Sequence, residues 1–503
     1  MKSFENKTTS NFFKVLQNRE VLIAIASTVL LLSLFQFGAH ITAPSLIIPN
    51  ANASTAGSPD VLGLLNLLGG GGLNRVSLFA VGISPYITAQ IIIQMLSTDI
   101  IRPLSELKKS GELGRRKLEL YTRLLTLPFA IATAYGALVL VSNIQLVKFV
   151  VNGSRVDNLS QVPAGQQVLL VLLLVAGTYI ALFLSDIISK KGVGNGPTLI
   201  IMSGIISSIP QNLAASFSFF SLRAIGENSV FITIATFIIY LFFYFVLLFV
   251  ITFINGALRK IPVQQTGQGL VKNAEDLPFL PIKIIPAGVI PVIFASSLLA
   301  IPGTVAEFIR TSDPSGYSFI QTYLTLNSPT GLSIYGILIV AFSFFYSHIQ
   351  VNAEELTENF EKSGRFIPGI SIGLATFNHI RQIVNRVNWL GGPFLAAVSV
   401  LPNVLTITTG IPSNAALGGT GVIILVTGSI QFWEAIKSTS TSIYYRTQKK
   451  VLQAKVHSNS DLLLAESLAL KNNNFVPKES LFPVNSDHKS LKDDHSDEDW
   501  TIW

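Results

Sequence analysis

The chain contains no cysteine and few charged residues. Of its 503 residues only 13% are Asp, Glu, Lys or Arg, whereas 49% are hydrophobic. Soluble domains carry roughly 25% charged residues. The absence of cysteine excludes disulfides, thiolate catalysis and cysteine metal sites. The shortage of charge, together with the hydrophobic excess, predicts a membrane protein.

Groups of residues that would support catalysis are also missing. The histidines, at positions 40, 348, 379, 457, 488 and 495, are scattered, and no pair has metal-ligand spacing with a carboxylate partner. No nucleophile, base and orienting acid can be assembled. The stretch Gly192 to Gly196 lacks the preceding strand and the Gly-Lys-Ser/Thr ending of a phosphate loop, so it is predicted to be a tight turn. We therefore expect a protein that is not an enzyme and that uses no cofactor and no metal.

Long apolar runs are abundant. A helix needs about 20 apolar residues to cross a bilayer, and ten runs are predicted to span it, the fifth being short. They cover residues 21–39, 76–96, 124–141, 167–185, 198–209, 230–254, 284–308, 331–351, 390–409 and 418–433. The one charged residue inside these runs is Glu307, near an end. Because a charge at the bilayer centre costs at least about 2.5 kcal/mol, this pattern is expected of membrane spans.

The positive charges indicate how the chain is oriented and divided. Of the 35 Lys and Arg residues, only those at 75, 148, 155, 223 and 310 lie in the loops after odd-numbered runs. Loops rich in Lys and Arg stay cytoplasmic, so both termini are predicted to be cytoplasmic. The predicted regions are an N-terminal segment 1–20, a first half 21–209, an external loop 210–229, a second half 230–445 and a tail 446–503. The composition of the tail is typical of disorder.

The second run carries features that a helix surrounded by lipid does not need. Gly69 to Gly72 precede it, and Gly82 and Pro85 interrupt it. Polar side chains lie along it, at Ser84, Thr88, Gln90 and Gln94. Such a helix is expected to line a wet or protein-filled path, although a kinked structural span would show the same residues.

Two segments of the chain resemble signatures of the SecY family, the central subunit of the protein-export channel. They are GISPYITAQIIIQ at 82–94 and FLSDIISKKGVGNGPTLIIM at 183–202, and the likeness extends from about Phe12 to Tyr445. It implies an all-α polytopic membrane protein, with ten transmembrane helices in two inverted five-helix halves around a central pore. Unfolded secretory proteins would cross through the pore. Apolar segments would leave sideways into lipid, between spans two and three on one side and seven and eight on the other.

The resemblance also implies a pore ring of isoleucines, at Ile83, Ile87, Ile201, Ile293 and Ile424. A sixth family position falls on Pro197 and departs from the pattern. Branched apolar side chains that meet at a narrow waist leave water without hydrogen-bond partners, so the waist dries and ions stop. Ordinary helix packing is the alternative explanation for each isoleucine alone.

A short apolar piece, Val61 to Leu68, lies between the first two runs and is too short to span. The resemblance places the channel plug over residues 61–73, and its apolar side chains would be Leu64, Leu65, Leu67 and Leu68. A surface loop that happens to contain leucines is the alternative.

Two long loops, 258–283 and 352–389, are predicted on the cytoplasmic side. The resemblance implies that they dock the ribosome or the SecA ATPase, through Arg259, Lys260, Arg365 and Arg381; solvated connectors are the alternative. The chain has Ser371 and Ile372 where the family usually has Arg-Pro, which bears on the contact with SecA. The other implied partners are small membrane subunits of the SecE and SecG type, signal peptides, nascent chains and the lipid bilayer.

Two other functions stay open from the residues alone. A secondary transporter of a small solute would need convergent polar or charged ligands near the midplane, which the apolar runs lack. An inert scaffold for membrane assembly is the third possibility. The expected location is the plasma membrane of a bacterium, with a plastid thylakoid membrane as the second choice.

Overall fold

The computed structural model describes residues 19–44, 46–47, 70, 76–98, 101–143, 147–151, 154–156, 158–223, 229–265, 278–309, 313–326, 328–409 and 420–441. The chain divides into two units, Met1–Ile436 and Lys437–Trp503. Of the second unit only residues 437–441 are described, as the end of a helix. The predicted tail, 446–503, lies outside the described residues, as does nearly all of the predicted N-terminal segment.

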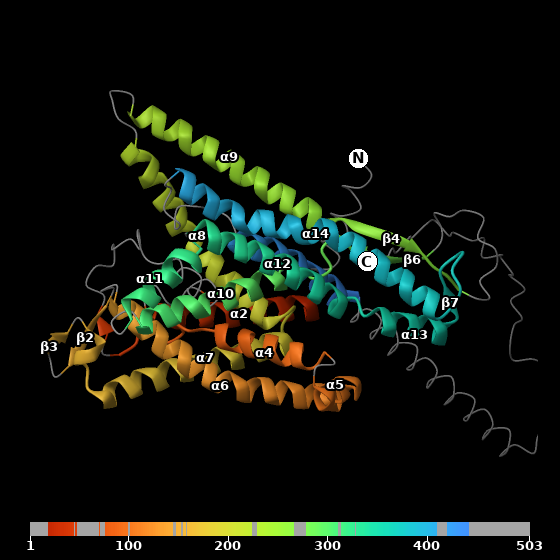
Figure 1. Cartoon of the computed structure of the whole chain (residues 1–503), viewed down its shortest axis with the longest axis horizontal. Coiled ribbons are helices and arrows are strands. Elements are labelled where there is room, and N and C mark those ends of the chain that lie inside the picture. The colour runs from red at the N-terminus through yellow and green to blue at the C-terminus, as the bar shows by residue number, and fades with distance from the viewer. Residues whose placement is uncertain are drawn as a thin grey trace, which may run out of the picture. The chain divides into compact units, whose positions relative to one another are not determined.

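Helices make up most of the first unit (Figure 1). They are α2 (Arg19–His40), α4 (Ser84–Leu96), α5 (Arg102–Lys109), α6 (Glu112–Asn143), α7 (Ala164–Lys191), α8 (Gly196–Arg223), α9 (Ser229–Gly256), α10 (Ile290–Ile309), α11 (Pro314–Tyr323), α12 (Pro329–Gln350), α13 (Ala353–Ser363), α14 (Leu374–Thr409) and a further helix over residues 420–441. The strands are β1 (Leu46–Ile47), β2 (Lys148–Val151), β3 (Ser154–Val156), β4 (Leu258–Pro262), β5 (Gln264–Gln265), β6 (Phe279–Lys283) and β7 (Arg365–Phe366).

The helical membrane fold predicted from the apolar runs is confirmed. Each of the ten predicted runs contains a helix. Within the described residues, seven helical segments are long and apolar enough to cross a membrane, and α10 adds a shorter apolar stretch, Ile290–Gly303. The number of ten crossings stays a prediction.

The second predicted span, 76–96, is helical only in its second part, because the interruption expected at Gly82 and Pro85 separates a non-helical start from the helix. Val76 and Gly82 have positive φ angles of 41° and 54°, which a right-handed helix does not allow. The helix α4 begins only at Ser84, where Pro85 fits the first turn because its missing N–H has no helical acceptor. With 13 residues, or about 20 Å, α4 alone cannot cross a hydrocarbon core of roughly 30 Å.

The predicted end of the fifth span at Ile209 is wrong, and most of the predicted external loop 210–229 is helical. The helix α8 continues through Pro210 to Arg223. Proline removes one backbone hydrogen bond, but membrane helices tolerate it because neighbouring groups satisfy the freed carbonyl. Aromatic contacts join this extension to α9, with ring centroids 5.3 Å apart for Phe217 and Phe237 and 5.5 Å apart for Phe220 and Tyr240.

The two long predicted loops fold together into one structure, which we call the loop layer: β4 to β7, α13 and residues 374–389 of α14. The strand β4 runs antiparallel to β6, with Leu258 opposite Lys283, and β5 runs antiparallel to β7, with Gln264 opposite Phe366. A separate apolar core holds the layer, formed by Ile261, Val263, Ile282, Ala353, Phe360, Ile367, Ile380, Ile383, Val384 and Val387. The ninth span, predicted from Leu390, therefore belongs to a helix that begins at Leu374.

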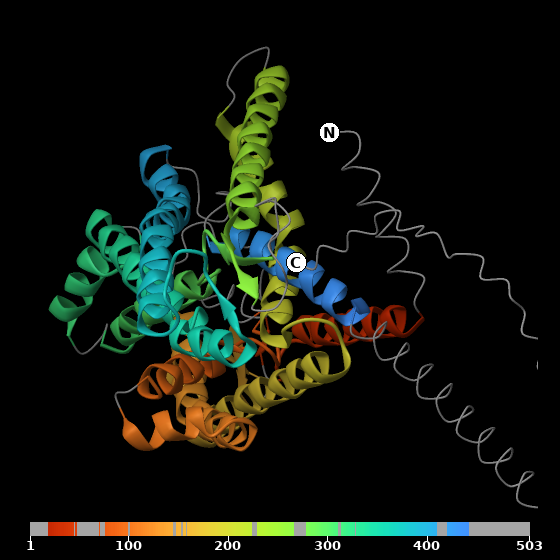
Figure 2. The same ribbon diagram turned by 90° about the vertical axis from the view of Figure 1, so that its right-hand side faces the viewer.

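The loop layer lies at one end of the first unit, and a small sheet lies at the other (Figure 1). In that sheet β2 pairs with β1 and β3, antiparallel to both. Its buried residues, among them Leu46 and Phe149, pack with α6 and α7 in a second apolar cluster. Figure 2 views the molecule from the loop-layer end.

One close approach gives a test of this fold. A Cβ atom on Gly177 of α7 would lie 1.9 Å from the carbonyl oxygen of Leu78. Alanine favours a helix over glycine by about 1 kcal/mol, but overpacking a close contact costs about 1–3 kcal/mol or more. We expect Gly177→Ala to lower the melting temperature of the detergent-solubilised protein.

The matched control is Gly165→Ala in the first turn of the same helix, where a Cβ would meet no atom within 4 Å. This variant should be neutral or slightly stabilising. Equal melting temperatures for the two variants would contradict the close packing of α7 against Leu78.

Candidate functional site

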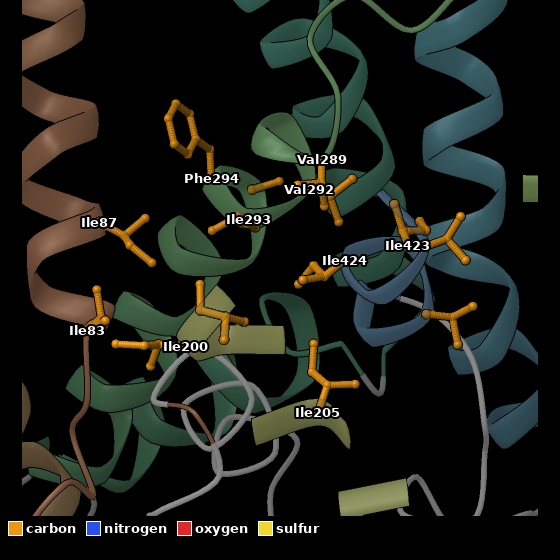
Figure 3. Close-up of a cluster of buried hydrophobic side chains, with 14 of the residues drawn as sticks. Ile83, Ile87, Ile200, Ile205, Val289, Val292, Ile293, Phe294, Ile423 and Ile424 are labelled. Atoms are coloured by element: carbon orange, nitrogen blue, oxygen red, sulfur yellow. The ribbon is translucent and has the colours of Figure 1, made fainter. Parts of the chain in front are cut away.

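The five predicted ring isoleucines lie in one buried apolar cluster. Their side chains are exposed by 0% (Ile83), 8% (Ile87), 1% (Ile201), 6% (Ile293) and 0% (Ile424). They come from four elements far apart in the sequence: the start of α4, α8, α10 and the helix 420–441. In Figure 3, the two isoleucines of α4 lie to one side of Ile293 and Ile424. The structure thus brings the mapped positions together, and whether they form a pore ring is addressed below.

Ile83 and Ile87 are held in place by the non-helical residues that precede α4. Ile83 is the N-cap residue of α4, and its carbonyl oxygen accepts hydrogen bonds from the N–H groups of Tyr86 (3.0 Å) and Ile87 (3.1 Å). Ahead of it, the Leu78 N–H donates to the carbonyl oxygen of Ile41 (3.1 Å). The ring of Phe79 stacks on that of Phe35 at 5.0 Å. The non-helical residues therefore anchor the start of α4 to the end of α2.

The stretch 192–196 is the tight turn that the sequence predicts, and it sets the position of α8. Gly194 has a φ of 92°, and a Cβ on Gly196 would lie 2.0 Å from the carbonyl oxygen of Ser185. The Val193 N–H donates to the Thr28 hydroxyl on α2 at 2.9 Å. The chain thus turns from α7 directly into α8, which carries Ile201 one turn into the helix.

Further side chains of the same cluster lie around the mapped positions and were not predicted. They are Ile200, Ile205, Val289, Val292, Phe294 and Ile423, all shown in Figure 3. A signal for two of them was present in the sequence: Ile205 and Val289 stand four residues from Ile201 and Ile293, which is one helical turn. Pro197, the departing sixth position, is half-buried in the first turn of α8.

The chemistry at the five mapped positions is that of hydrocarbon alone. Isoleucine side chains carry no donor, acceptor or charge, so they offer an ion no ligand and water no hydrogen bond. A pore lined by such side chains would block conduction by staying dry. Contacts between them are non-directional, so such a lining could also part and close again without breaking specific bonds.

The loop layer gathers the predicted docking cations. Arg259 and Lys260 lie exposed on β4, while Ile261 beside them points into the core of the layer. The Nζ atom of Lys260 lies 4.6 Å from the centroid of the Phe279 ring, within cation–π range. Arg365 is exposed on β7, which pairs with β5 just beyond β4, and Arg381 is exposed on α14. The four cations thus lie on one folded layer.

The family departure at 371–372 lies in an exposed turn of the loop layer. Gly369 and Gly373 bracket it with φ angles of 81° and 95°. The Thr376 hydroxyl donates to the carbonyl oxygen of Ser371 at 2.9 Å, and the Ile372 side chain is 56% exposed. The chain thus presents an apolar side chain where the family usually presents a proline after a cationic residue.

The predicted plug leucines, Leu64, Leu65, Leu67 and Leu68, lie outside the described residues. Gly70 is the described member of the segment 61–73, with a φ of 84°. It packs against α8, because a Cβ on Gly204 would lie 2.2 Å from the Gly70 backbone. A Cβ on Gly70 itself would lie 2.9 Å from the Phe35 ring and 3.6 Å from Ile200. Gly70, within the predicted plug segment, therefore lies beside the isoleucine cluster.

Long apolar helices packed around a buried apolar cluster define a polytopic membrane protein. The sequence model of the SecY family matches residues 77–433. The protein translocase subunit SecY of Mycoplasma pneumoniae is 45% identical over 448 residues, covering 89% of this chain and 92% of that protein. The SecY subunit of Bacillus subtilis is 36% identical over 445 residues, covering 88% and 98%. The chain therefore belongs to the SecY family and is a multi-pass protein of a bacterial plasma membrane.

Solved structures agree with this fold. The chain is similar to a structure described as that of a protein conducting channel, with a TM-score of 0.58 and 18% identity, covering 82% of this chain and 91% of that one. It is also similar to Sec61 in the canine ribosome-channel complex from the endoplasmic reticulum, with a TM-score of 0.54, 18% identity and the same coverage of both chains. At this identity the likeness concerns the fold.

Proposed function

We propose that the buried isoleucine cluster is the seal of a pore through which unfolded proteins cross the membrane. As a SecY family member the chain is a subunit of a protein-conducting channel. The observation that carries the proposed seal is that Ile83, Ile87, Ile201, Ile293 and Ile424 come from four separate elements and share one buried apolar cluster. Figure 3 shows four of them, Ile83, Ile87, Ile293 and Ile424, near one another in that cluster.

A hydrocarbon seal suits a channel that passes chains of varied sequence. A crossing polypeptide presents charged, polar and apolar side chains in turn, so a seal with specific polar ligands would retain some of them. Apolar contacts are individually weak and non-directional, so the ring can close around each residue and reseal behind it. A small-solute transporter would instead need convergent polar ligands at this depth, and the ring positions supply none.

We infer that apolar segments leave the pore sideways, between α4 and α6 on one side and α10 and α12 on the other. In the described structure α10 packs against both α4 and α6, which closes this path. Separation along the same line would expose the ring to lipid. A sufficiently apolar segment would then partition into the bilayer, because burial of apolar surface is favourable.

We further infer that the loop layer faces the cytoplasm, with both chain termini on that side, as the Lys and Arg bias indicates. Its exposed cations, Arg259, Lys260, Arg365 and Arg381, suit an anionic partner surface such as ribosomal RNA or an acidic face of the SecA ATPase. The exposed Ile372 favours a partner with an apolar patch at that point. SecE- and SecG-type subunits would complete the channel, and signal peptides and nascent chains would be its substrates.

The seal makes a direct prediction. An amide at Ile424 would give water hydrogen-bond partners inside the ring and stabilise the wet, open state. A shift of about 1.4 kcal/mol would raise a minor open population roughly tenfold. We expect Ile424→Asn and Ile293→Asn to leak small ions at rest and to export proteins whose signal sequences are weakened.

The control is Ile424→Val, which keeps the ring apolar and shortens one side chain by a methyl group. It should stay closed, at a stability cost of about 0.5–1.5 kcal/mol. If Ile424→Asn lowers only the amount of protein, with conductance and export per molecule unchanged, the cluster is packing core and the proposed seal is wrong.

The docking cations predict salt-sensitive binding. Replacing Arg259 and Lys260 with glutamate removes two contacts to phosphate or carboxylate groups and adds repulsion, so partner affinity should fall and depend less steeply on salt concentration. Sedimentation with ribosomes, and with SecA in parallel, would show which partner is affected. The matched control reverses two cations of the opposite end, Lys148 and Arg155, which should leave binding unchanged.

If the segment 61–73 is the channel plug, its removal should let ions leak through the resting channel without unfolding the protein. Deleting residues 61–69 keeps Gly70 against α8 and removes the apolar piece, so the melting temperature should hold while resting conductance rises. A deletion variant with wild-type conductance would show that the segment is a surface loop.

A further inference from the structure

Tyr346 of α12 contacts both sides of the proposed sideways exit. Its hydroxyl donates to the Oε1 atom of Gln94 on α4, at 3.1 Å. Its ring meets the ring of Phe294 on α10 edge to face, with centroids 5.4 Å apart and planes at 87°. The side chain is only 7% exposed. One residue thus joins α4, from the first half of the chain, to α10 and α12, from the second.

We propose that the Tyr346–Gln94 hydrogen bond is the latch that holds the sideways exit closed and sets how apolar a segment must be to leave through it. This inference rests on the proposed function, and it names a positioning residue within it. Two further polar contacts each lie within one half of the chain: Gln36 bonds Ser203 in the first half, and Ser343 and Ser347 bond Asn388 in the second.

The latch is mechanically close to the seal. Phe294 follows Ile293 directly in α10, so an outward movement of α10 at the ring carries Phe294 with it. Phe294 is also held edge to face by Phe342 of α12, at 6.0 Å, so it moves against two aromatic rings. A crossing segment that displaces Ile293 therefore strains the packing around Tyr346, and the hydroxyl of Tyr346 must leave Gln94 before α4 and α12 can separate.

The hydroxyl, rather than the ring, carries the proposed role. The side-chain carbonyl oxygen of Gln94 accepts from the Tyr346 hydroxyl. The backbone carbonyl oxygen of Gln94 separately accepts from the hydroxyls of Ser97 and Thr98. Removing the hydroxyl leaves the aromatic packing and the end of α4 unchanged. Loss of one hydrogen bond between membrane helices changes the equilibrium constant between the closed and the open state by a factor of about 3 to about 20. The open fraction should change by a factor in this range.

The test uses the complete channel in proteoliposomes or in cells and a series of polyalanine segments with increasing numbers of leucines. For each variant, the fraction of segments released into lipid is measured per channel. The half-point is the number of leucines at which half of the segments are released into lipid. Tyr346→Phe should shift the half-point to fewer leucines, with release of marginal segments raised about 3-fold to about 20-fold. Gln94→Leu should shift it similarly. The double variant should shift it no further than either single one, because both remove the same bond.

Tyr335→Phe is the matched control, since Tyr335 is also buried on α12 and its hydroxyl interacts with Ser399 of α14, within the second half, and not with α4. Tyr335→Phe should leave the half-point unchanged. Tyr346→Phe should leave the resting ion leak unchanged, because the isoleucines of the proposed seal are intact. An unaltered half-point in Tyr346→Phe, or additive shifts in the double variant, would overturn the latch. Failure of the proposed function looks different, because the wild-type channel itself would then pass none of the segments.

Discussion

The proposed function places one constraint on the structure: the centre of the molecule must be dry when idle and still able to part. Hydrocarbon side chains satisfy both conditions, because they exclude water and hold one another only by non-directional contacts. The five isoleucines and their apolar neighbours form such a centre, buried to 8% exposure or less. Polar side chains at the five mapped positions would offer hydrogen bonds to water and weaken the proposed seal.

The elements around the seal are arranged so that its members move with other parts of the protein. The strand β6 of the loop layer leads into α10, which carries Ile293, over residues 284–289. The Nζ atom of Lys283, at the end of β6, lies 2.6 Å and 2.8 Å from the two carboxylate oxygens of Glu434, on the helix that carries Ile424. Both charged groups are partly exposed, so this ion pair adds little stability. It does give the loop layer a second attachment, to a second member of the seal.

Much of the fold could be predicted because apolar runs and glycine-rich turns are local signals. The helices within the ten runs and the turn at Gly194 follow from them, and resemblance to a family located the ring. The errors came from non-local forces. The start of α4 at Ser84 depends on the pairing of the preceding segment with the end of α2, and α8 passes Pro210 because neighbouring groups compensate the lost bond. The β5–β7 pairing joins residues about 100 positions apart, which no local pattern indicates.

The same reasoning explains why the buried isoleucines could be predicted and the contact between Gln94 and Tyr346 could not. The two family signatures mark positions along the sequence, so the resemblance can point to single residues such as Ile83 and Ile201. A hydrogen bond between two helices forms only when both side chains lie at the same level along the helix axes and point toward each other. Both conditions depend on how α4 and α12 pack. Gln94 alone indicated only that α4 lines something other than lipid. The structure adds the partner, and with it the physical meaning of that glutamine: a polar side chain satisfied in the closed state, whose bond must be given up when the two halves separate.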